Sequence, residues 1–190
     1  KIQLSELDKE EIKILRNVAP YLRDREPLNK VIWKVYYEKP TTDLIGRVIG
    51  SGIHTGIYKI TNLDNVFWYS GTKNFNGDIS QWDVSNVKTM YAMFQDAEFN
   101  GDISEWNVSK VEDMTCMFRM SEFNGDISSW DVSRVNNMES MFRGSHFNGD
   151  ISKWKVSSLK NIDSMFAGSI FNKDISRWDV SNVLYMQRVF

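Results

Sequence analysis

The sequence contains only one cysteine among its 190 residues. A single cysteine excludes an intrachain disulfide framework, so packing has to stabilise the fold. Cys116 occupies a repeated position that holds Ala92, Ser140, Ser164 and Arg188 elsewhere. That set predicts a small side chain near the surface.

Histidine is scarce as well, and its two copies give no support to an enzyme. His54 lies in a glycine-rich stretch and His146 at a variable position of a repeat, and neither belongs to a Cys-His or Ser-His-Asp constellation. The spacing of Gly46, Gly50 and Gly52 lacks the Gly-Lys-Ser/Thr end of a phosphate loop. We therefore expect a non-enzymatic protein without catalytic residues, cofactor or metal.

Long apolar runs and an excess of either charge are also missing. The 23 basic and 25 acidic residues give a formal charge of -2, so no broad basic field would attract nucleic acid. No segment approaches the ~20 apolar residues needed to span a bilayer, and the first residues lack the pattern of a signal peptide. Composition therefore predicts no nucleic-acid partner and no membrane span, and it leaves the localisation open.

What the sequence does contain is a unit of 24 residues that recurs without insertion. The unit begins at Phe75 and starts again at Phe99, Phe123, Phe147 and Phe171. One such unit is too short to bury its own apolar face, so a constant period predicts a stacked array.

Each unit combines two apolar patterns. Ile79, Trp82 and Val84 have the spacing of a short strand whose alternate side chains point inward. The spacing from Val87 to Phe94 predicts a helical or 3-10 return. We therefore predict an α/β repeat solenoid, a right-handed coil like that of leucine-rich repeats, with short parallel strands and helical or 3-10 returns.

The repeat register extends weakly towards the N-terminus. One period before Trp82 and Met90 stand Tyr58 and Val66, which predicts a degenerate first coil over residues 58–74. The repeat solenoid should therefore cover residues 58–190, with five repeats from residue 75.

Residues 1–57 show no repeat. Capping and periodicity predict a helix at residues 5–23, and a β-branched and aromatic run predicts a strand at residues 31–37. We expect this segment to form a small N-terminal α+β cap, because the end coils of repeat arrays usually meet something other than a repeat.

Three polar positions recur along the array. They hold asparagine (Asn76, Asn100, Asn124, Asn148, Asn172), glycine (Gly77, Gly101, Gly125, Gly149) and aspartate (Asp78, Asp102, Asp126, Asp150, Asp174). An internal asparagine ladder, glycines at positive φ and Asp-x-Ser turns would explain them structurally. A column of carboxylates also suits calcium, and this alternative stays open.

The signature Phe-Asn-Gly-Asp-Ile-Ser-x-Trp-Asp-Val-Ser-x-Val-x-x-Met-x-x-Met-Phe resembles the BspA-type bacterial surface repeat, a divergent leucine-rich repeat, over residues 75–190. Proteins with similar repeats are often bacterial surface proteins or lipoproteins, and the repeat also occurs in protists and viral genomes. The resemblance implies adhesion or protein binding, without cofactor or catalytic residues. It implies a cell-surface or secreted location, and a cytoplasmic or virion-associated one is the alternative.

Variable exposed positions are where a repeat array carries specificity. Two such columns follow the predicted strands and change from acidic or neutral to basic along the array: Gln81, Glu105, Ser129, Lys153 and Arg177, and Asp83, Asn107, Asp131, Lys155 and Asp179. We predict that these columns bind a partner protein.

Two other functions fit the same sequence. One is a structural subunit of a virion or surface assembly that contacts its neighbours through its ends, with self-association through the C-terminal coil. The other is a small phage- or virus-encoded inhibitor of a host factor that binds through residues 1–57.

Overall fold

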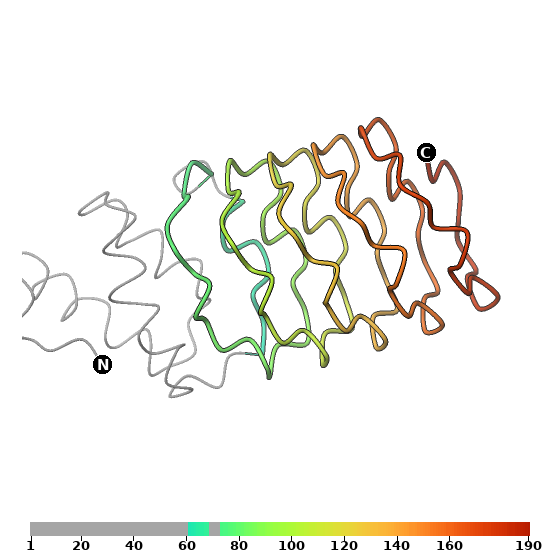
Figure 1. Ribbon diagram of the computed structural model, residues 1–190, viewed down its shortest axis with the longest axis horizontal. Helices are drawn as coiled ribbons and strands as arrows, with labels where there is room; N and C mark the ends of the chain where they lie inside the picture. The colour runs from blue at the N-terminus through green and yellow to red at the C-terminus, as the bar shows by residue number, and fades with distance from the viewer. Residues whose placement is uncertain (1–60, 69–72) are drawn as a thin grey trace, which may run out of the picture.

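The computed structural model describes residues 61–68 and 73–190, and Figure 1 shows this part of the chain as a row of stacked coils that runs to the C-terminus. We refer to residues 73–96, 97–120, 121–144, 145–168 and 169–190 as coils 1 to 5, and to residues 61–68 as the leading segment. The helix predicted at 5–23, the strand at 31–37 and the cap at 1–57 lie outside the described residues.

The described ranges contain no helix and no strand longer than an isolated bridge. Neighbouring coils pair through one parallel bridge each: Asn62 with Thr89, Thr89 with Asp113, Asp113 with Asn137, Asn137 with Asn161, and Asn161 with Tyr185. We call the residues from each bridge onward, such as 89–96 in coil 1, the ladder segment. The right-handed, leucine-rich-repeat class of the array stays a prediction.

Backbone hydrogen bonds of alternating direction hold the ladder segment. In coil 1 the N–H groups of Met90, Ala92, Phe94 and Asp96 donate to carbonyls of coil 2 over 2.8–3.0 Å. N–H groups between them close turns within the coil, as Met93 does on the carbonyl of Met90 at 3.2 Å. The first set of N–H groups bonds to carbonyls of the next coil and the second set to carbonyls of its own coil. These peptide groups are therefore hydrogen-bonded although they form neither a helix nor a continuous strand.

This backbone differs from the predicted strand and helical return. The strand expected at Trp82 and Val84 makes no bridge, and the segment expected to be helical carries the pairing between coils. Positive φ angles explain the difference. Ala92 has a φ of 50° and Asp96 a φ of 55°, and a right-handed helix cannot continue through residues in the left-handed region.

The leading segment is shifted from its predicted register. The N–H of Leu63 donates to the carbonyl of Thr89 at 3.0 Å, as the N–H of Met90 donates to Asp113 in the next coil. Leu63 therefore takes the place of Met90, a place that the 24-residue period had assigned to Val66. The predicted register of the degenerate first coil is wrong, although its boundaries are untested.

The aromatic rings give the same alignment. Phe67 stacks on Phe94 at a centroid distance of 5.2 Å, and these two residues are 27 positions apart rather than 24. The additional residues lie between Phe67 and Phe75, whose rings stack at 4.5 Å. The sequence between the two rings is therefore longer here than in the later coils, whereas the ring stack is preserved.

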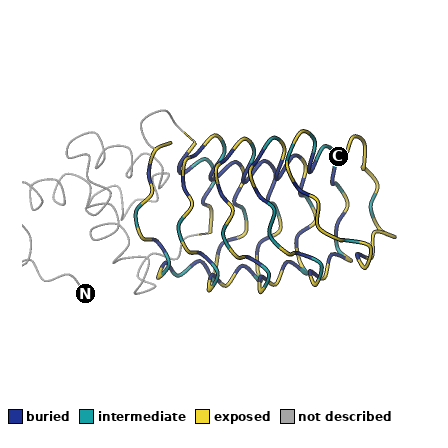
Figure 2. Cartoon of the chain, turned by 45° about the horizontal axis from the view of Figure 1, so that its top comes forward, coloured by how far each residue is buried: buried dark blue, intermediate teal, exposed yellow. Residues whose placement is uncertain are grey.

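Two columns of phenylalanine rings fill the centre of the stack. Phe118 and Phe123 of neighbouring columns stack at 4.3 Å, and each ring also stacks on its copy in the next coil, Phe142 at 5.7 Å and Phe147 at 6.3 Å. Figure 2 shows buried and exposed stretches alternating along the coils, with coil 5 largely exposed. Stacked rings contribute about 0.5–1.5 kcal/mol per pair beyond the area they bury.

The tryptophan column is also internal. Trp106, Trp130, Trp154 and Trp178 are at most 7% exposed, and each indole N–H donates to an isoleucine carbonyl of the preceding coil over 3.0–3.1 Å. The indole N–H of Trp82 has no hydrogen-bond acceptor among the described residues. The tryptophans therefore join the coils and offer no stacking platform to a ligand.

The repeated glycines are required for space and not for a special φ. Among the glycines of the described residues, only Gly144 and Gly168 have positive φ, so the prediction for Gly101 and its copies is wrong. A Cβ at Gly101 would lie 2.8 Å from the ring of Phe99. The side chain is absent here because the stacked rings pass directly beside the backbone.

The prediction that Cys116 lies near the surface is also wrong. The residue is 8% exposed and has a φ of 56°, and its copies Ala92 and Ser140 are buried with similar angles. Burial raises the pKa of the Cys116 thiol. Small side chains suit both a crowded interior and a surface, so the composition of this column could not separate the two.

Candidate functional site

The first aspartate column builds turns. In every coil a carboxylate oxygen accepts the N–H of the serine two residues later over 2.8–2.9 Å, in the pairs Asp78–Ser80, Asp102–Ser104, Asp126–Ser128, Asp150–Ser152 and Asp174–Ser176. Hydrogen bonds from the backbone and hydroxyl of Ser128 lower the pKa of Asp126, against an opposing effect of Asp150. The column therefore has the Asp-x-Ser turns that the sequence suggested.

The second predicted binding column has the same role, which the sequence analysis did not foresee. Asp83, Asn107, Asp131 and Asp179 each accept the N–H of the serine two residues later over 3.0–3.2 Å. The hydroxyl and N–H of Ser133 lower the pKa of Asp131. Lys155 is the one member of this column that cannot form such a turn. Asp-x-Ser occurs here in the sequence too, so the signal was present.

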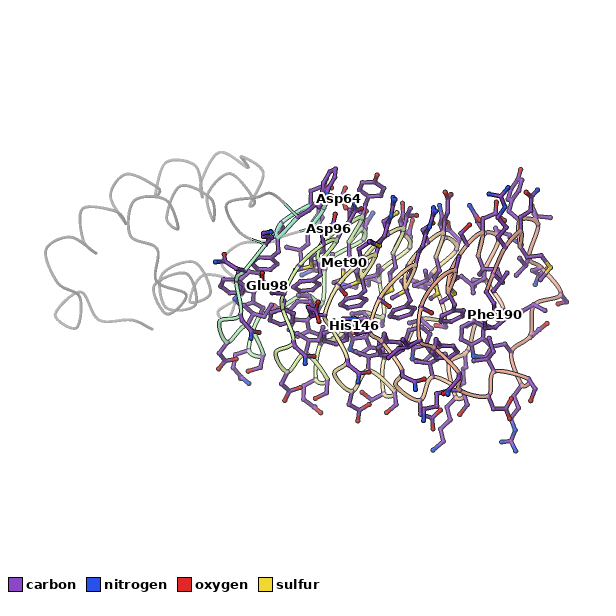
Figure 3. All side chains as sticks on the ribbon, turned by 90° about the horizontal axis from the view of Figure 1, so that it is seen from above. Asp64, Met90, Asp96, Glu98, His146 and Phe190 are labelled. Carbon is purple, nitrogen blue, oxygen red and sulfur yellow. The ribbon has the colours of Figure 1, made fainter. Side chains whose placement is uncertain are left out.

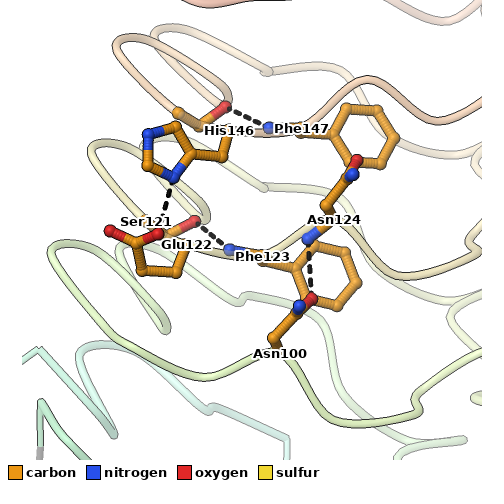
Figure 4. A network of polar contacts seen from close by, with 8 residues as sticks. Asn100, Ser121, Glu122, Phe123, Asn124, His146 and Phe147 are labelled. Atoms are coloured by element: carbon orange, nitrogen blue, oxygen red, sulfur yellow. Dashed lines mark hydrogen bonds and ion pairs between the residues drawn. The ribbon is translucent and has the colours of Figure 1, made fainter.

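The asparagines form a ladder of a different kind from the one predicted. The side-chain carbonyl of Asn100 accepts the backbone N–H of Asn124 at 2.8 Å, and the same bond recurs between each pair of neighbouring coils from Asn76 to Asn172 (Figure 4). Asn100 and Asn124 are exposed and not internal. The amide side chains therefore tie the outer corner of one coil to the backbone of the next.

One backbone N–H in each ladder segment is left to a side chain. Asn137 accepts the N–H of Glu139 at 3.0 Å, and Asn62, Asp113 and Asn161 do the same in their coils. Coil 1 has Thr89 at this position, and there Asp64 of the leading segment accepts the N–H of Tyr91 at 2.8 Å. Each of these N–H groups thus finds an acceptor within its own coil or in the preceding one.

The first predicted binding column remains available to a partner. We call Gln81, Glu105, Ser129, Lys153 and Arg177 the corner column, and all five are exposed. Ser129 donates its hydroxyl to the carbonyl of Ser104 at 3.0 Å. The side chains of Gln81, Glu105, Lys153 and Arg177 make no hydrogen bond or ion pair with any described residue. The corner column is therefore exposed along the stack, whereas four of the five members of the other column accept hydrogen bonds within turns.

A groove beside the corner column lies between coils 3 and 4. It has a volume of about 400 Å³ and is lined by Asn124, Gly125, Asp126, Ser128, Asn148, Gly149, Asp150 and Lys153. The amide, carboxylate, hydroxyl and ammonium groups of this lining can both donate and accept hydrogen bonds. Lys153 belongs to the groove and to the corner column, so a single bound chain could contact both.

The described residues form no constellation for metal or acid–base chemistry. Across 61–68 and 73–190, no three His, Cys, Asp or Glu side chains are grouped as metal ligands would be. His146 pairs with Glu122 of the previous coil at 2.6 Å, and Figure 4 shows both side chains on the outside of the stack. More than half of each side chain is exposed. Nor does the described part of the chain include a helix that could cross a membrane.

These features define a repeat protein, in which constant side chains build stacked coils and variable side chains lie along their edges. The chain belongs to the family described as Mycoplasma protein of unknown function, DUF285, whose model matches residues 54–145 and again residues 119–190. The two matches overlap, as expected when one pattern fits a periodic array in more than one position. No curated protein and no solved structure matches the chain.

Proposed function

We propose that this protein is a non-enzymatic binding module that holds a partner protein along the corner column. The observation that carries this proposal is the contrast between neighbouring columns. The constant aspartates and asparagines are engaged in hydrogen bonds of the scaffold. The side chains of Gln81, Glu105, Lys153 and Arg177 are exposed and form no hydrogen bond or ion pair within the described part of the chain. Exposed side chains that the scaffold does not use can vary without disturbing the fold.

The charges of the corner column favour a partner with the opposite distribution. Glu105 of coil 2 calls for a basic group, and Lys153 and Arg177 of coils 4 and 5 call for acidic ones. Hydrogen bonds between coils already hold the backbone that carries these side chains, so binding has to order the side chains but not the backbone. Such rim-like charges act mainly on association rate and orientation. The groove beside Lys153 would supply the more enclosed part of the interface.

The resemblance to BspA-type surface repeats supports a partner met in adhesion or surface recognition. A bacterial surface location is part of this proposal, and membership of a family without an established function is compatible with it.

The proposal is tested by capturing a partner from the native host or its prey with three forms of the chain. The corner variant has Gln81, Glu105, Lys153 and Arg177 changed to alanine. A matched variant has alanine at Lys88, Glu112, Asn136 and Lys160, which are also exposed and without internal partners. Each variant removes one acidic and two basic groups, so their net charges agree.

We expect the unaltered chain and the matched variant to capture the same protein, and the corner variant to lose at least tenfold in affinity. Thermal unfolding of all three forms should coincide, because neither set takes part in the scaffold. Equal capture by the corner variant and the unaltered chain would contradict the assignment of the site. Loss of binding in both variants would point to a general electrostatic effect and would contradict it as well.

A further inference from the structure

Coils 1 to 4 carry the same dipeptide beside the aspartate turns. Asparagine is followed by glycine at 76–77, 100–101, 124–125 and 148–149, whereas lysine follows Asn172 in coil 5. Packing requires the glycine, because a Cβ at Gly101, Gly125 or Gly149 would lie 2.8–2.9 Å from a phenylalanine ring. The contact between coils uses the asparagine, whose side-chain carbonyl accepts the N–H of the next asparagine over 2.8–3.1 Å. The fold therefore keeps both residues of the dipeptide in place.

An asparagine followed by glycine can cyclise, because glycine has no side chain to hinder the approach of its nitrogen to the amide carbon. At Asn124 the nitrogen of Gly125 would give its proton to hydroxide and form a bond to Cγ. The bond from Cγ to Nδ2 then breaks, and Nδ2 leaves as ammonia after taking a proton from water. Water opens the cyclic imide at either carbonyl and gives aspartate or isoaspartate. The whole reaction consumes one water, releases one ammonia and needs no oxidant or reductant.

The reacting groups are accessible in the folded array. Three of the four asparagines are exposed, and Asn148 is half-buried. Among the described residues, neither the side-chain NH2 groups of these asparagines nor the backbone N–H groups of Gly101, Gly125 and Gly149 donate a hydrogen bond to a neighbour. Nucleophile and leaving group are therefore both open to water and base.

The hydrogen bond between coils favours the reaction further. The backbone N–H of Asn148 donates to Oδ1 of Asn124 at 2.8 Å. Negative charge develops on this oxygen when the glycine nitrogen attacks Cγ, and a donor already aimed at such an oxygen stabilises the charge. The bond that holds neighbouring coils together therefore also stabilises the intermediate.

Two of the four dipeptides line the groove between coils 3 and 4, together with Asp126, Asp150 and Lys153. Figure 3 shows His146, which stands two residues before Asn148, on the side of the stack that faces the viewer. Conversion of Asn124 and Asn148 would add two carboxylates to this groove. The groove would then repel the acidic groups that Lys153 would bind.

We propose that the Asn-Gly dipeptides are sites of spontaneous deamidation, and that the reaction at Asn124 and Asn148 weakens partner binding as the protein ages. The effect on binding rests on the function proposed above. Aspartate leaves the array intact, because its carboxylate still accepts the N–H of the next coil. Isoaspartate lengthens the main chain by one carbon and distorts the corner.

The first test is peptide mapping by mass spectrometry of the folded full chain. The chain is incubated at neutral and at mildly alkaline pH and digested under acidic conditions that stop the reaction. We expect each Asn-Gly dipeptide to gain about one dalton, faster at the higher pH, and to yield both aspartate and isoaspartate. Asn86 and Asn107 are exposed but followed by valine, and they should keep their amides.

Two results of this mapping would overturn the proposal. The folded chain could retain all four amides while a sample unfolded in urea loses them, which would show that the ladder holds the side chains away from the glycine nitrogens. Equal loss at Asn86 and Asn107 would show that exposure alone explains the reaction.

The second test measures the effect on binding with two matched variants. The groove variant has Asn124→Asp and Asn148→Asp, and the control has Asn76→Asp and Asn100→Asp, which add the same charge outside the groove. Both should unfold at similar temperatures, since every aspartate still accepts the N–H of the next coil. In the capture experiment we expect the groove variant to bind about tenfold more weakly than the unaltered chain, because like charges across an interface cost affinity. The control should bind no more weakly than the unaltered chain.

The outcomes separate this inference from the proposed function. Equal capture by the groove variant and the unaltered chain would overturn the effect of deamidation on binding and leave the corner column as the binding site. Failure of every form to capture a partner would contradict the proposed function and its regulation together. The mass spectra decide the modification in either case.

Discussion

Changing Asp64 to alanine should destabilise the array, and changing Thr89 to asparagine in the same chain should restore its stability. Asp64 lies in the leading segment, and one of its carboxylate oxygens accepts both the hydroxyl of Thr89 at 2.7 Å and the N–H of Tyr91 at 2.8 Å. Without Asp64, the N–H of Tyr91 loses its acceptor. In coils with asparagine at the position of Thr89, the asparagine side chain accepts the equivalent N–H, as Asn137 accepts that of Glu139.

The expected cost follows from these two bonds. Hydrogen bonds to a charged group contribute about 1.5–3 kcal/mol when buried, and the partial exposure of this site reduces the loss to about 1–2 kcal/mol. Thr89→Asn alone should be close to neutral, since Asp64 still accepts the N–H. In the double variant the new amide takes over, so the two changes should couple by about 1 kcal/mol.

Urea unfolding of the four proteins, followed by tryptophan fluorescence, measures this coupling as a double-mutant cycle. Equal slopes of the free energy against urea are needed for the comparison to hold. The reasoning is refuted if the double variant is destabilised by the sum of the single effects. That result would mean that the side chain at position 89 does not accept the N–H of Tyr91.

Three further predictions concern single columns. Met120 is 57% exposed and has a φ of 56°, at a position where the later coils have glycine. Met120→Gly should therefore stabilise the chain by about 0.5–1 kcal/mol and raise the midpoint of thermal unfolding. A lower midpoint would show that the positive φ does not cost stability at this position. Trp130→Phe should cost about 0.5–1.5 kcal/mol in urea unfolding, because the carbonyl of Ile103 loses the indole donor and keeps only the N–H of Trp106. An unchanged stability would show that the indole bond contributes nothing. Hydrogen bonds from the serines lower the pKa values of the turn aspartates in the folded protein. The stability that these carboxylates contribute is therefore complete above about pH 4, near their pKa in the unfolded chain, and is lost as the pH falls through their pKa in the folded protein. A urea midpoint that does not fall between pH 5 and pH 3 would oppose this account.

The sequence predicted the features that depend on period. Constant spacing from Phe75 onward is enough to place the same residue at the same point of each coil, and the tryptophans, phenylalanines and turn aspartates lie in such columns. The backbone conformation was beyond that reasoning. Ala92, Cys116 and Ser140 adopt positive φ without being glycine, and nothing in their side chains indicates it. The strand and the helical return were therefore assigned to the wrong kinds of backbone.

The exposure of the predicted binding columns could be predicted from the sequence, whereas their hydrogen bonds were missed. Exposure of the corner column follows from its variability, and it holds in the structure for Gln81 and Lys153. Variability alone did not show that Asp83 and Asp131 are held by serines two residues later. The Asp-x-Ser motif occurs in both aspartate columns, and it forms the same turn in both. The shifted register could not be predicted, because Leu63 and Val66 are both apolar and either could take the place of Met90.

The stretch of sequence between Phe67 and Phe75 is longer than the equivalent stretch in the later coils, and this difference has a practical consequence. Four residues separate Phe94 from Phe99, whereas seven separate Phe67 from Phe75, and the two rings are 4.5 Å apart in both pairs. The number of residues between the two rings can therefore change while the ring contact stays the same, because closing a slightly longer connection costs little entropy. The equivalent positions of the later coils should therefore accommodate inserted peptides. An epitope or tag inserted after Asp96 or Met120 should be displayed by an otherwise unaltered array.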